Sequence, residues 1–225
     1  LSFSIKDKGA SISLISLNQI KSKYKIYVKV DKIKKYFYVN SIFENDLKNI
    51  LAAISIISIF IDIKKLDENI FYYHQKPKGR GDVIKIKLPK KSFFLVDESY
   101  NSNPLSLKSA LKNFDMIKVD DFKKHLILGD MLELGTYSKN LHKEIGENIN
   151  KLSLKNVNVI GKDIKITYKK LNKNKRGSIL EDESQIINLI KNSLNNNDYL
   201  MIKGSNSTGL NALTRKIKMG KINAL

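Results

Sequence analysis

Short apolar runs that each give way to a polar loop and then to an amphipathic segment recur along the chain after residue 90. The runs lie at residues 92–96, 125–128, 157–160 and 199–202 and are rich in Leu, Ile, Val and Phe. Such runs, bounded by turn residues, are typical of strands buried in a sheet. Strands that alternate with helices predict an α/β fold with a mostly parallel sheet and right-handed crossovers.

The helices between these strands are predicted from capping residues and apolar spacing. Asn103 can cap a helix that opens at Pro104, and Asp182 with Gln185 can form a capping box for a later helix. The stretch at residues 169–176 is basic and is predicted to be an exposed loop or a strand edge. Apolar residues at helical spacing are expected to face the sheet: Leu107, Ala110, Leu111 and Phe114; Leu141, Ile145 and Leu152; Ile186, Ile187, Ile190 and Leu194; Leu210, Leu213 and Ile217.

The first part of the chain has a different pattern. Residues 24–30 alternate apolar and aromatic side chains with lysines, which predicts a half-exposed strand, and a hairpin can join this strand to residues 33–39. An apolar helix is expected at about residues 47–61. Residues 75–81 contain one proline and two glycines and are predicted to form an interdomain hinge. We therefore expect two domains, at residues 1–76 and 77–225.

The chain has a formal net charge of +19 at pH 7, which raises the question of a nucleic-acid partner. The lysines, however, are spread along the whole sequence. Arginine, which suits bidentate recognition of phosphates and bases, occurs only as Arg80, Arg176 and Arg215. This distribution disfavours nucleic-acid binding.

Cysteine is absent, so disulfides and thiolate metal sites are excluded. The longest apolar run, residues 50–61, is too short to span a bilayer, and no signal peptide is recognisable. A cytoplasmic protein with no membrane partner is expected.

Three polar loops follow the carboxyl ends of predicted strands, at residues 97–104, 129–135 and 203–209. The carboxyl ends of parallel strands lie along one edge of a sheet, so these loops can converge on one crevice. Asp97, at a strand end, suits a ribose diol. Asn101 could contact a purine edge or hold its own loop, and Asn103 is better explained as a helix cap. Asx-turns are the alternative explanation for the whole segment.

The other candidate groups have equally plain structural alternatives. The loop that begins with Lys203 resembles an anion site at a helix N-terminus, or else a glycine-rich turn with a Ser or Thr cap; its spacing is not that of a Walker A loop. Asp130 and Glu133 could be paired carboxylates, but no metal-ligand spacing accompanies them, and no metal site is predicted. Arg80, between two glycines, suits phosphate or marks a flexible hinge. His142 is expected to be a surface or packing histidine.

Taken in order, these segments resemble the Mur ligase family. The residues that carry the resemblance are Gly79-Arg80-Gly81, residues 97–104, residues 129–135, His142, and Lys203-Gly204-Ser205 with Gly209. Their order and spacing are more specific than any single segment. The strings Ser-Tyr-Asn-x-Asn-Pro and Gly-Asp-Met-x-Glu-Leu-Gly favour the members that add D-alanyl-D-alanine. Siblings, such as the diaminopimelate- or lysine-adding ligases or folylpolyglutamate synthase, are the alternative.

The resemblance implies a remnant of a central ATP-binding domain at residues 1–76 and a Rossmann-like C-terminal domain at residues 77–225. It also implies part of an ATP-dependent ligase of peptidoglycan (cell wall) synthesis, in which D-alanyl-D-alanine is joined to a UDP-N-acetylmuramoyl-tripeptide through an acyl phosphate. ATP and Mg²⁺ are the implied cofactors. The partners are these small molecules, and a monomer is expected.

By matching positions, the resemblance places Arg80 near the nucleotide phosphates, Asp97 near the ribose, and Tyr100 and Asn101 near the nucleotide. Either Asn45 or Asn49 would contact adenine. The family's histidine four residues earlier has no counterpart in either register. The substrate-binding candidates are Asp130, Glu133, Lys203 and Ser205.

The family's phosphate-binding loop, with its catalytic lysine and magnesium ligands, is missing from this sequence. No catalytic residue is therefore predicted here, and a fragment that is inactive alone is expected. Asn206 also stands where the family commonly has an arginine. A non-catalytic basic module that binds nucleotide or nucleic acid is the remaining alternative.

Overall fold

The computed structural model describes residues 1–21, 23–73, 78–118 and 123–221. The chain divides into two compact units, Leu1–Gln75 and Lys76–Leu225, and each unit is described by itself. The domain boundary expected after residue 76, and the first part of the expected hinge, lie outside the described residues. Among the residues that are described, every helix is too short or too polar to traverse a lipid bilayer.

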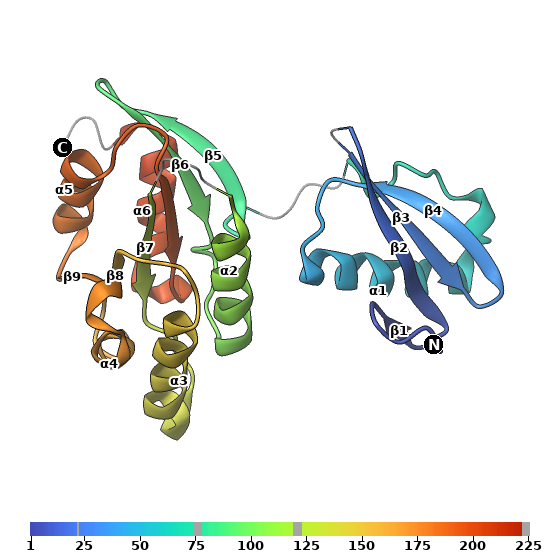
Figure 1. Cartoon of the computed structure of the whole chain (residues 1–225), viewed down its shortest axis with the longest axis horizontal. Coiled ribbons are helices and arrows are strands. Elements are labelled where there is room, and N and C mark those ends of the chain that lie inside the picture. Colours follow the sequence, from blue (N-terminus) through green and yellow to red (C-terminus); the bar gives the residue numbers. More distant parts are fainter. Residues whose placement is uncertain (22, 74–77, 119–122, 222–225) are drawn as a thin grey trace. The chain divides into compact units, whose positions relative to one another are not determined.

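The first unit is a four-stranded sheet with one long helix. Its strands β1 (Phe3–Ser4), β2 (Ile12–Ile20), β3 (Lys23–Val30) and β4 (Ile33–Val39) lie in the order of the chain. β1 is parallel to β2, and the other two pairs are antiparallel. Helix α1 (Glu44–Phe60) covers one face (Figure 1), where Val28, Phe37 and Leu51 are buried in a common core. The predicted hairpin and apolar helix are confirmed.

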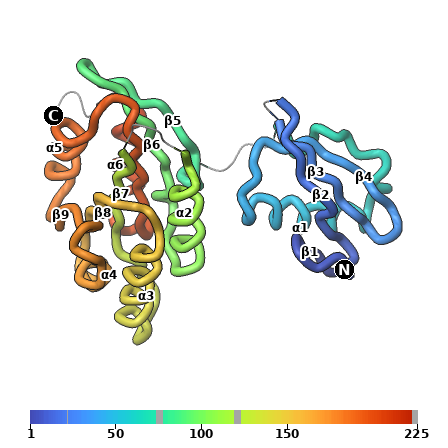
Figure 2. The backbone as a smooth tube through the Cα atoms, in the orientation of Figure 1, coloured from blue at the N-terminus to red at the C-terminus, as the bar shows by residue number. Residues whose placement is uncertain are grey.

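The second unit is built on a six-stranded sheet in the order β5-β6-β10-β7-β8-β9. Its strands are β5 (Asp82–Lys87), β6 (Ser92–Asp97), β7 (Lys124–Gly129), β8 (Val157–Ile160), β9 (Arg176–Leu180) and β10 (Tyr199–Lys203). All neighbours are parallel except β5, which runs antiparallel to β6. Figure 2 shows the last strand, in red, lying between the green segments of β6 and β7. The predicted α/β fold with a mostly parallel sheet is confirmed.

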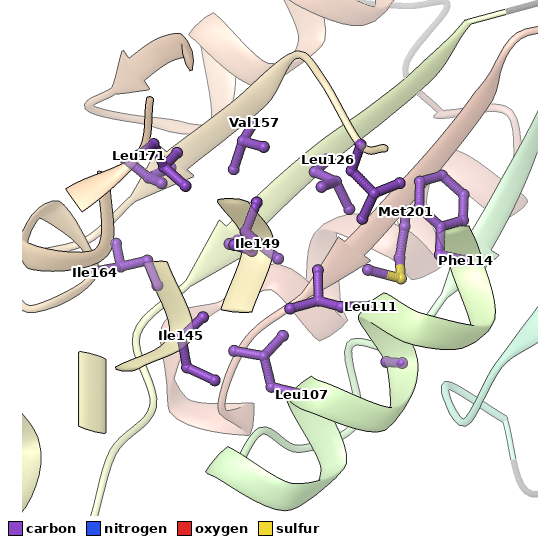
Figure 3. Close-up of a cluster of buried hydrophobic side chains, with 14 of the residues drawn as sticks. Leu107, Leu111, Phe114, Leu126, Ile145, Ile149, Val157, Ile164, Leu171 and Met201 are labelled. Carbon is purple, nitrogen blue, oxygen red and sulfur yellow. The ribbon is translucent and has the colours of Figure 1, made fainter. Parts of the chain in front are cut away.

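Helices cover both faces of this sheet (Figure 1). One face carries α2 (Pro104–Met116), α3 (Ser138–Asn150) and α4 (Ile164–Lys170), and the other carries α5 (Glu183–Ser193) and α6 (Leu210–Lys218). Figure 3 shows Leu111 and Phe114 of α2 lying against Leu126 of β7 and Met201 of β10. Because all four side chains are almost completely buried, truncating one of the large apolar groups would cost about 2–5 kcal/mol.

The predicted caps are largely as expected. The Asn103 side chain accepts a hydrogen bond from the Ser106 amide, and Ser106 closes a capping box with the Asn103 amide. At α5, the Asp182 side chain accepts from the Gln185 amide, but the Gln185 side chain accepts from the amide of Glu181 instead. The capping box predicted there is therefore only half formed.

The strand β5 and the helix α4 were not predicted, and most of β9 lies beyond the stretch for which a strand edge was considered. β5 is an edge strand whose alternating side chains follow directly on the segment taken for a hinge. α4 is only seven residues long and rich in β-branched side chains, which favour strands. Leu152 was expected on the inward face of a helix, but α3 ends at Asn150, and Leu152 packs on the same core from beyond the helix. The stretch at residues 169–176 spans the end of α4, a short 3₁₀ turn and the start of the edge strand β9.

Candidate nucleotide and substrate site

The loops that follow β6, β7 and β10 meet at the carboxyl edge of the second unit's sheet. Ser205, in the loop after β10, is the residue that joins them. Its Oγ donates to the Ser102 carbonyl (3.1 Å) and accepts from the Leu132 amide (2.8 Å), and its own amide donates to the Asp130 carbonyl (2.9 Å). The predicted convergence of the three loops is confirmed. It occurs where β10 separates β6 from β7, a change of strand order at which α/β sheets place ligands.

Lys203 is the last residue of β10, and its buried ammonium group contacts other groups of the protein. Its side chain is 2% exposed, and Nζ donates to the Asn101 carbonyl (2.9 Å) and lies 3.5 Å from a carboxylate oxygen of Glu98. Burial lowers the pKa of the Lys203 ammonium, and the negative charge of Glu98 opposes this shift. Lys203 therefore stabilises the loop after β6 through the Asn101 carbonyl. Its ammonium group is not exposed to a ligand, as the predicted anion site would require.

Arg80 is exposed to solvent, and its guanidinium group lies over the ring of Tyr100. Its guanidinium carbon lies 4.7 Å from the centre of the Tyr100 ring, and both side chains are exposed. The backbone under this pair is fixed, because the Tyr100 amide donates to the Gly79 carbonyl (3.2 Å) and the Gly81 amide donates to the Asp97 carbonyl (2.8 Å). Gly79 and Gly81 have φ of 80° and 88°, in the left-handed region that glycine tolerates. Here Arg80 belongs to an ordered loop of the second unit, and the expected flexible hinge does not extend to it.

Asp97 is buried beneath this loop. One carboxylate oxygen accepts from the Ser99 amide (3.0 Å) and hydroxyl (2.6 Å), and the other lies 2.5 Å from Lys218 Nζ. Lys218 also lies 2.5 Å from Asp82, whose second oxygen accepts from the Gly79 amide (2.8 Å). Burial by itself would lower the pKa of Lys218, but its hydrogen bonds to the two carboxylates outweigh this effect and raise it. A ribose contact of Asp97 stays a prediction, since the residue is 3% exposed and both of its carboxylate oxygens already have partners.

Asn101 is exposed and shapes its own loop. Its side-chain oxygen accepts from the Ser102 amide (2.8 Å), and its carbonyl is held by Lys203. This is the loop-holding role that the sequence left open as an alternative. A contact of Asn101 or Tyr100 with nucleotide stays a prediction.

Asp130 has a structural role that the sequence pattern did not reveal. Its two oxygens accept from the amides of Ile164 (2.7 Å) and Lys162 (3.0 Å), at the start of α4. Glu133 is exposed in the left-handed conformation, with φ of 62°. Their substrate contacts, like that of Ser205, remain predictions.

His142 is buried on α3 and ties the loop after β7 to that helix. Its Nδ1 donates to the Ser138 carbonyl (2.8 Å), and its Nε2 accepts from the Met131 amide (3.4 Å). The expected packing role is confirmed.

Asn45 and Asn49 lie on the exposed side of α1, in the first unit. The choice between them for the adenine contact remains open. A surface hollow of about 480 Å³ also belongs to the first unit, between the β3–β4 turn and the end of α1, and none of the candidate site residues lines it. Among the described residues, no group of three or more His, Asp or Glu side chains could hold a metal ion.

The polar network under the Arg80 loop includes residues that sequence reasoning missed. The Thr214 hydroxyl of α6 shares a hydrogen bond with the Ser99 hydroxyl (2.8 Å), and the side-chain NH₂ of Asn211 donates to the same hydroxyl (3.3 Å). Asn211, Thr214 and Lys218 are three and four residues apart, which puts them on one helical face. A row of polar residues beside the apolar face of α6 was therefore the sequence signal from which this network could have been predicted.

Comparison with known proteins agrees with this geometry. Residues 79–206 match the family described as Mur ligase, glutamate ligase domain. The chain is 28% identical over 175 residues to the UDP-N-acetylmuramoyl-tripeptide–D-alanyl-D-alanine ligase of Haemophilus influenzae, covering 74% of this chain and 35% of the relative. It is also 28% identical over 227 residues to the ligase of the same name from Buchnera aphidicola, covering 96% of this chain and 45% of that protein.

A solved structure shows the same fold. The crystal structure of MurF ligase from Thermotoga maritima in complex with ADP superposes with a TM-score of 0.74 at 19% identity, covering 94% of this chain and 47% of that one. The chain thus spans less than half the length of each of these relatives. Since the family match extends over more than half of its residues, this chain belongs to the Mur ligase family.

Proposed function

We propose that this chain supplies part of an ATP-dependent ligase that joins D-alanyl-D-alanine to a UDP-N-acetylmuramoyl-tripeptide in peptidoglycan synthesis. The observation that carries the proposal is the edge formed by the three loops and the Arg80–Tyr100 pair, in a domain that matches the family over residues 79–206. In such a ligase, ATP activates the terminal carboxylate of the tripeptide as an acyl phosphate, which the amine of the dipeptide then attacks.

The residues of this chain would act by binding and orientation. Arg80 would pair with nucleotide phosphates, because a planar guanidinium offers them two parallel hydrogen bonds. Tyr100 and the glycines hold this guanidinium before the ligand arrives, which lowers the ordering cost of binding. Mg²⁺, when bound, would neutralise phosphate charge, but the described residues offer no cluster of ligands for it, and we assign it to none of them.

The remaining candidates fit supporting roles. Lys203 and Ser205 fix the loops that carry Asn101 and Leu132, so substitutions at these two positions would disturb the site through its backbone. No side chain of this chain is proposed to be catalytic, and turnover would need the segments that the longer relatives contain.

A chimera tests the proposal. The corresponding segment of the Haemophilus influenzae ligase would be replaced by this chain, and phosphate release from ATP would be measured with the UDP-linked tripeptide and D-alanyl-D-alanine. We expect release that requires both substrates. Release with diaminopimelate and a UDP-linked dipeptide instead would indicate a sibling ligase, and an inactive but folded chimera would contradict the proposal.

Arg80→Ala in this chimera is expected to raise the KM for ATP about tenfold to hundredfold, the effect of losing a charge-assisted phosphate contact. Arg215→Ala is the matched control, because Arg215 is an exposed arginine of the same unit on α6, outside the loops of the site. Equal effects of the two substitutions would refute the role of Arg80.

A further inference from the structure

One face of the first unit's sheet gathers tyrosine and lysine side chains, most of them half-buried. Ile26, Val28 and Phe37 point toward α1 and are buried. Their neighbours along the strands therefore lie on the opposite face. Across β3 and β4, Lys25 is paired with Tyr38, Tyr27 with Tyr36, and Lys29 with Lys34. We call these six residues the Tyr–Lys face.

The aromatic rings of this face are contiguous. The ring centres of Tyr27 and Tyr36 are 5.9 Å apart, and those of Tyr36 and Tyr38 are 5.8 Å apart. Lys25 Nζ lies 3.7 Å from the centre of the Tyr36 ring and 5.1 Å from that of Tyr27. The result is a row of tilted and edge-to-face rings, with the Lys25 ammonium lying over the Tyr36 ring.

The charge of the face is positive. Three of its six residues are lysines, and the positions of β2 that pair with Lys29, Tyr27 and Lys25 are the uncharged Ser13, Ser16 and Asn18. Lys23 extends the charge at one end, where its Nζ lies 4.3 Å from the Tyr72 ring. Glu68 brings a negative charge to this face, and its charge and its hydrogen bond raise the pKa of the Tyr36 hydroxyl.

We propose that the Tyr–Lys face binds single-stranded nucleic acid, with bases stacked on the tyrosine rings and phosphates paired with the lysines. Aromatic platforms beside basic side chains are the general means of holding single strands without sequence preference. A duplex hides the faces of its bases, so it cannot use the rings. From Lys23 to Lys29 the strand spans about 20 Å at about 3.4 Å per residue, enough for several nucleotides.

The Tyr–Lys face could not be predicted from the distribution of lysines along the sequence. The period of two in β3 and β4 places every second side chain on one surface, and the hairpin brings two such rows together. None of the six residues of the Tyr–Lys face is among the residues proposed above for the ligase site, so binding at this face can be tested separately from the ligase chemistry.

The test is fluorescence anisotropy of a labelled single strand of about twelve nucleotides, titrated with the complete chain. Tyr27→Leu and Tyr36→Leu keep apolar bulk on the strands, and circular dichroism would verify their folding. Each is expected to weaken binding about tenfold. Tyr137→Leu is the matched control, since Tyr137 is 71% exposed in the second unit.

Charge is tested separately, because a chain of net charge +19 attracts any polyanion. Lys25→Gln with Lys29→Gln is compared with Lys112→Gln and Lys139→Gln, two exposed lysines of the second unit. The first pair is expected to reduce the slope of log Kd against log salt by about 0.7 per lysine, and the second pair to leave it unchanged.

Three results would each overturn the proposal. The first is wild-type affinity in both tyrosine variants, the second is duplex bound as tightly as the single strand, and the third is an equal effect of the two lysine pairs. Preference for the single strand together with selective loss in the face variants would establish it.

Discussion

Lys218 of α6 contacts both Asp82, at the start of β5, and Asp97, at the end of β6, and Lys218→Met removes its charge while keeping most of its volume. The substitution leaves the carboxylates of Asp97 and Asp82 without the ammonium that lies 2.5 Å from each. Asp97 keeps its hydrogen bonds from Ser99. Asp82 keeps the one from Gly79. Their negative charges, however, become uncompensated.

The expected loss follows from burial. Removing one partner of a fully buried ion pair costs about 3–5 kcal/mol. The Lys218 side chain retains 19% exposure and Asp82 retains 24%, although Asp97 retains only 4%. Solvent therefore screens part of the network, and we expect the free energy of unfolding of the second unit to fall by about 2–3 kcal/mol.

Differential scanning calorimetry measures this loss, with the transition of the first unit as an internal reference. For a unit of this size, about 2–3 kcal/mol corresponds to a decrease in Tm of about 5–10 °C. Lys216→Met is the control on the same helix. Its Nζ lies 2.8 Å from Glu183, but the two side chains are 47% and 40% exposed, so the expected loss is at most about 0.5 kcal/mol.

The pH dependence gives a second check on Lys218. Its pKa is raised in the folded state above the ordinary value of 10.5. The ion pairs therefore contribute fully below about pH 10.5, and this stability is lost as the pH rises through the folded-state pKa. Lys218→Met should lack this alkaline loss. Equal decreases in Tm for the Lys218 and Lys216 variants, or a loss below about 1 kcal/mol for Lys218→Met, would refute the reasoning.

Two further predictions concern other buried contacts of the second unit. Burial lowers the pKa of His125, although the charge of Asp198 (3.2 Å) opposes this shift. The folded state therefore resists protonation, and the stability should fall as the pH drops below about 6.5. Thermal melts of His125→Gln between about pH 7.5 and 5.5 should lose this pH dependence, and a profile like that of the unsubstituted protein would contradict the prediction. Gly161 has φ of 129°, and an added Cβ would lie 2.6 Å from the Asp130 carboxylate, so Gly161→Ala should cost about 2–4 kcal/mol in urea unfolding. Gly135→Ala, with φ of 53° and open space around the Cβ, should cost only about 1–2 kcal/mol, and equal costs would refute the steric argument.

Much of the fold could be predicted because its signals are local. The apolar runs of β6, β7, β8 and β10 and the cap at Asn103 are readable within a few residues. α4 is different, because the Asp130 carboxylate that receives the amides at its start lies more than thirty residues earlier in the chain. A short helix of β-branched residues that depends on such a distant partner leaves no local pattern.

The site was predictable in position but not in detail. Spacing and loop chemistry placed Tyr100 and Ser205 at one edge of the sheet, whereas Arg80 was assigned to a hinge and only the family resemblance placed it near the nucleotide. The partners that bury Lys203 and Asp97 come from other elements, Glu98 and Lys218, and these contacts exist only once the sheet and α6 have assembled. A charged residue at a strand end looks the same in sequence whether it faces a ligand or holds a loop.

The position of β10 in the sheet determines when the second unit can complete its fold. The strand lies inside its sheet, with Tyr199 between Phe94 of β6 and Lys124 of β7, yet within the described part of the chain it is the last strand to be synthesised. Until then, β6 and β7 each present an unpaired inner edge, the kind of surface that recruits other strands and leads to aggregation. In the first unit, by contrast, strands that are adjacent in the chain are also adjacent in the sheet, and such local pairing forms faster. A chain cut short before Tyr199–Lys203 would therefore lack the strand that joins β6 to β7, and its second unit would expose both of these edges to other chains.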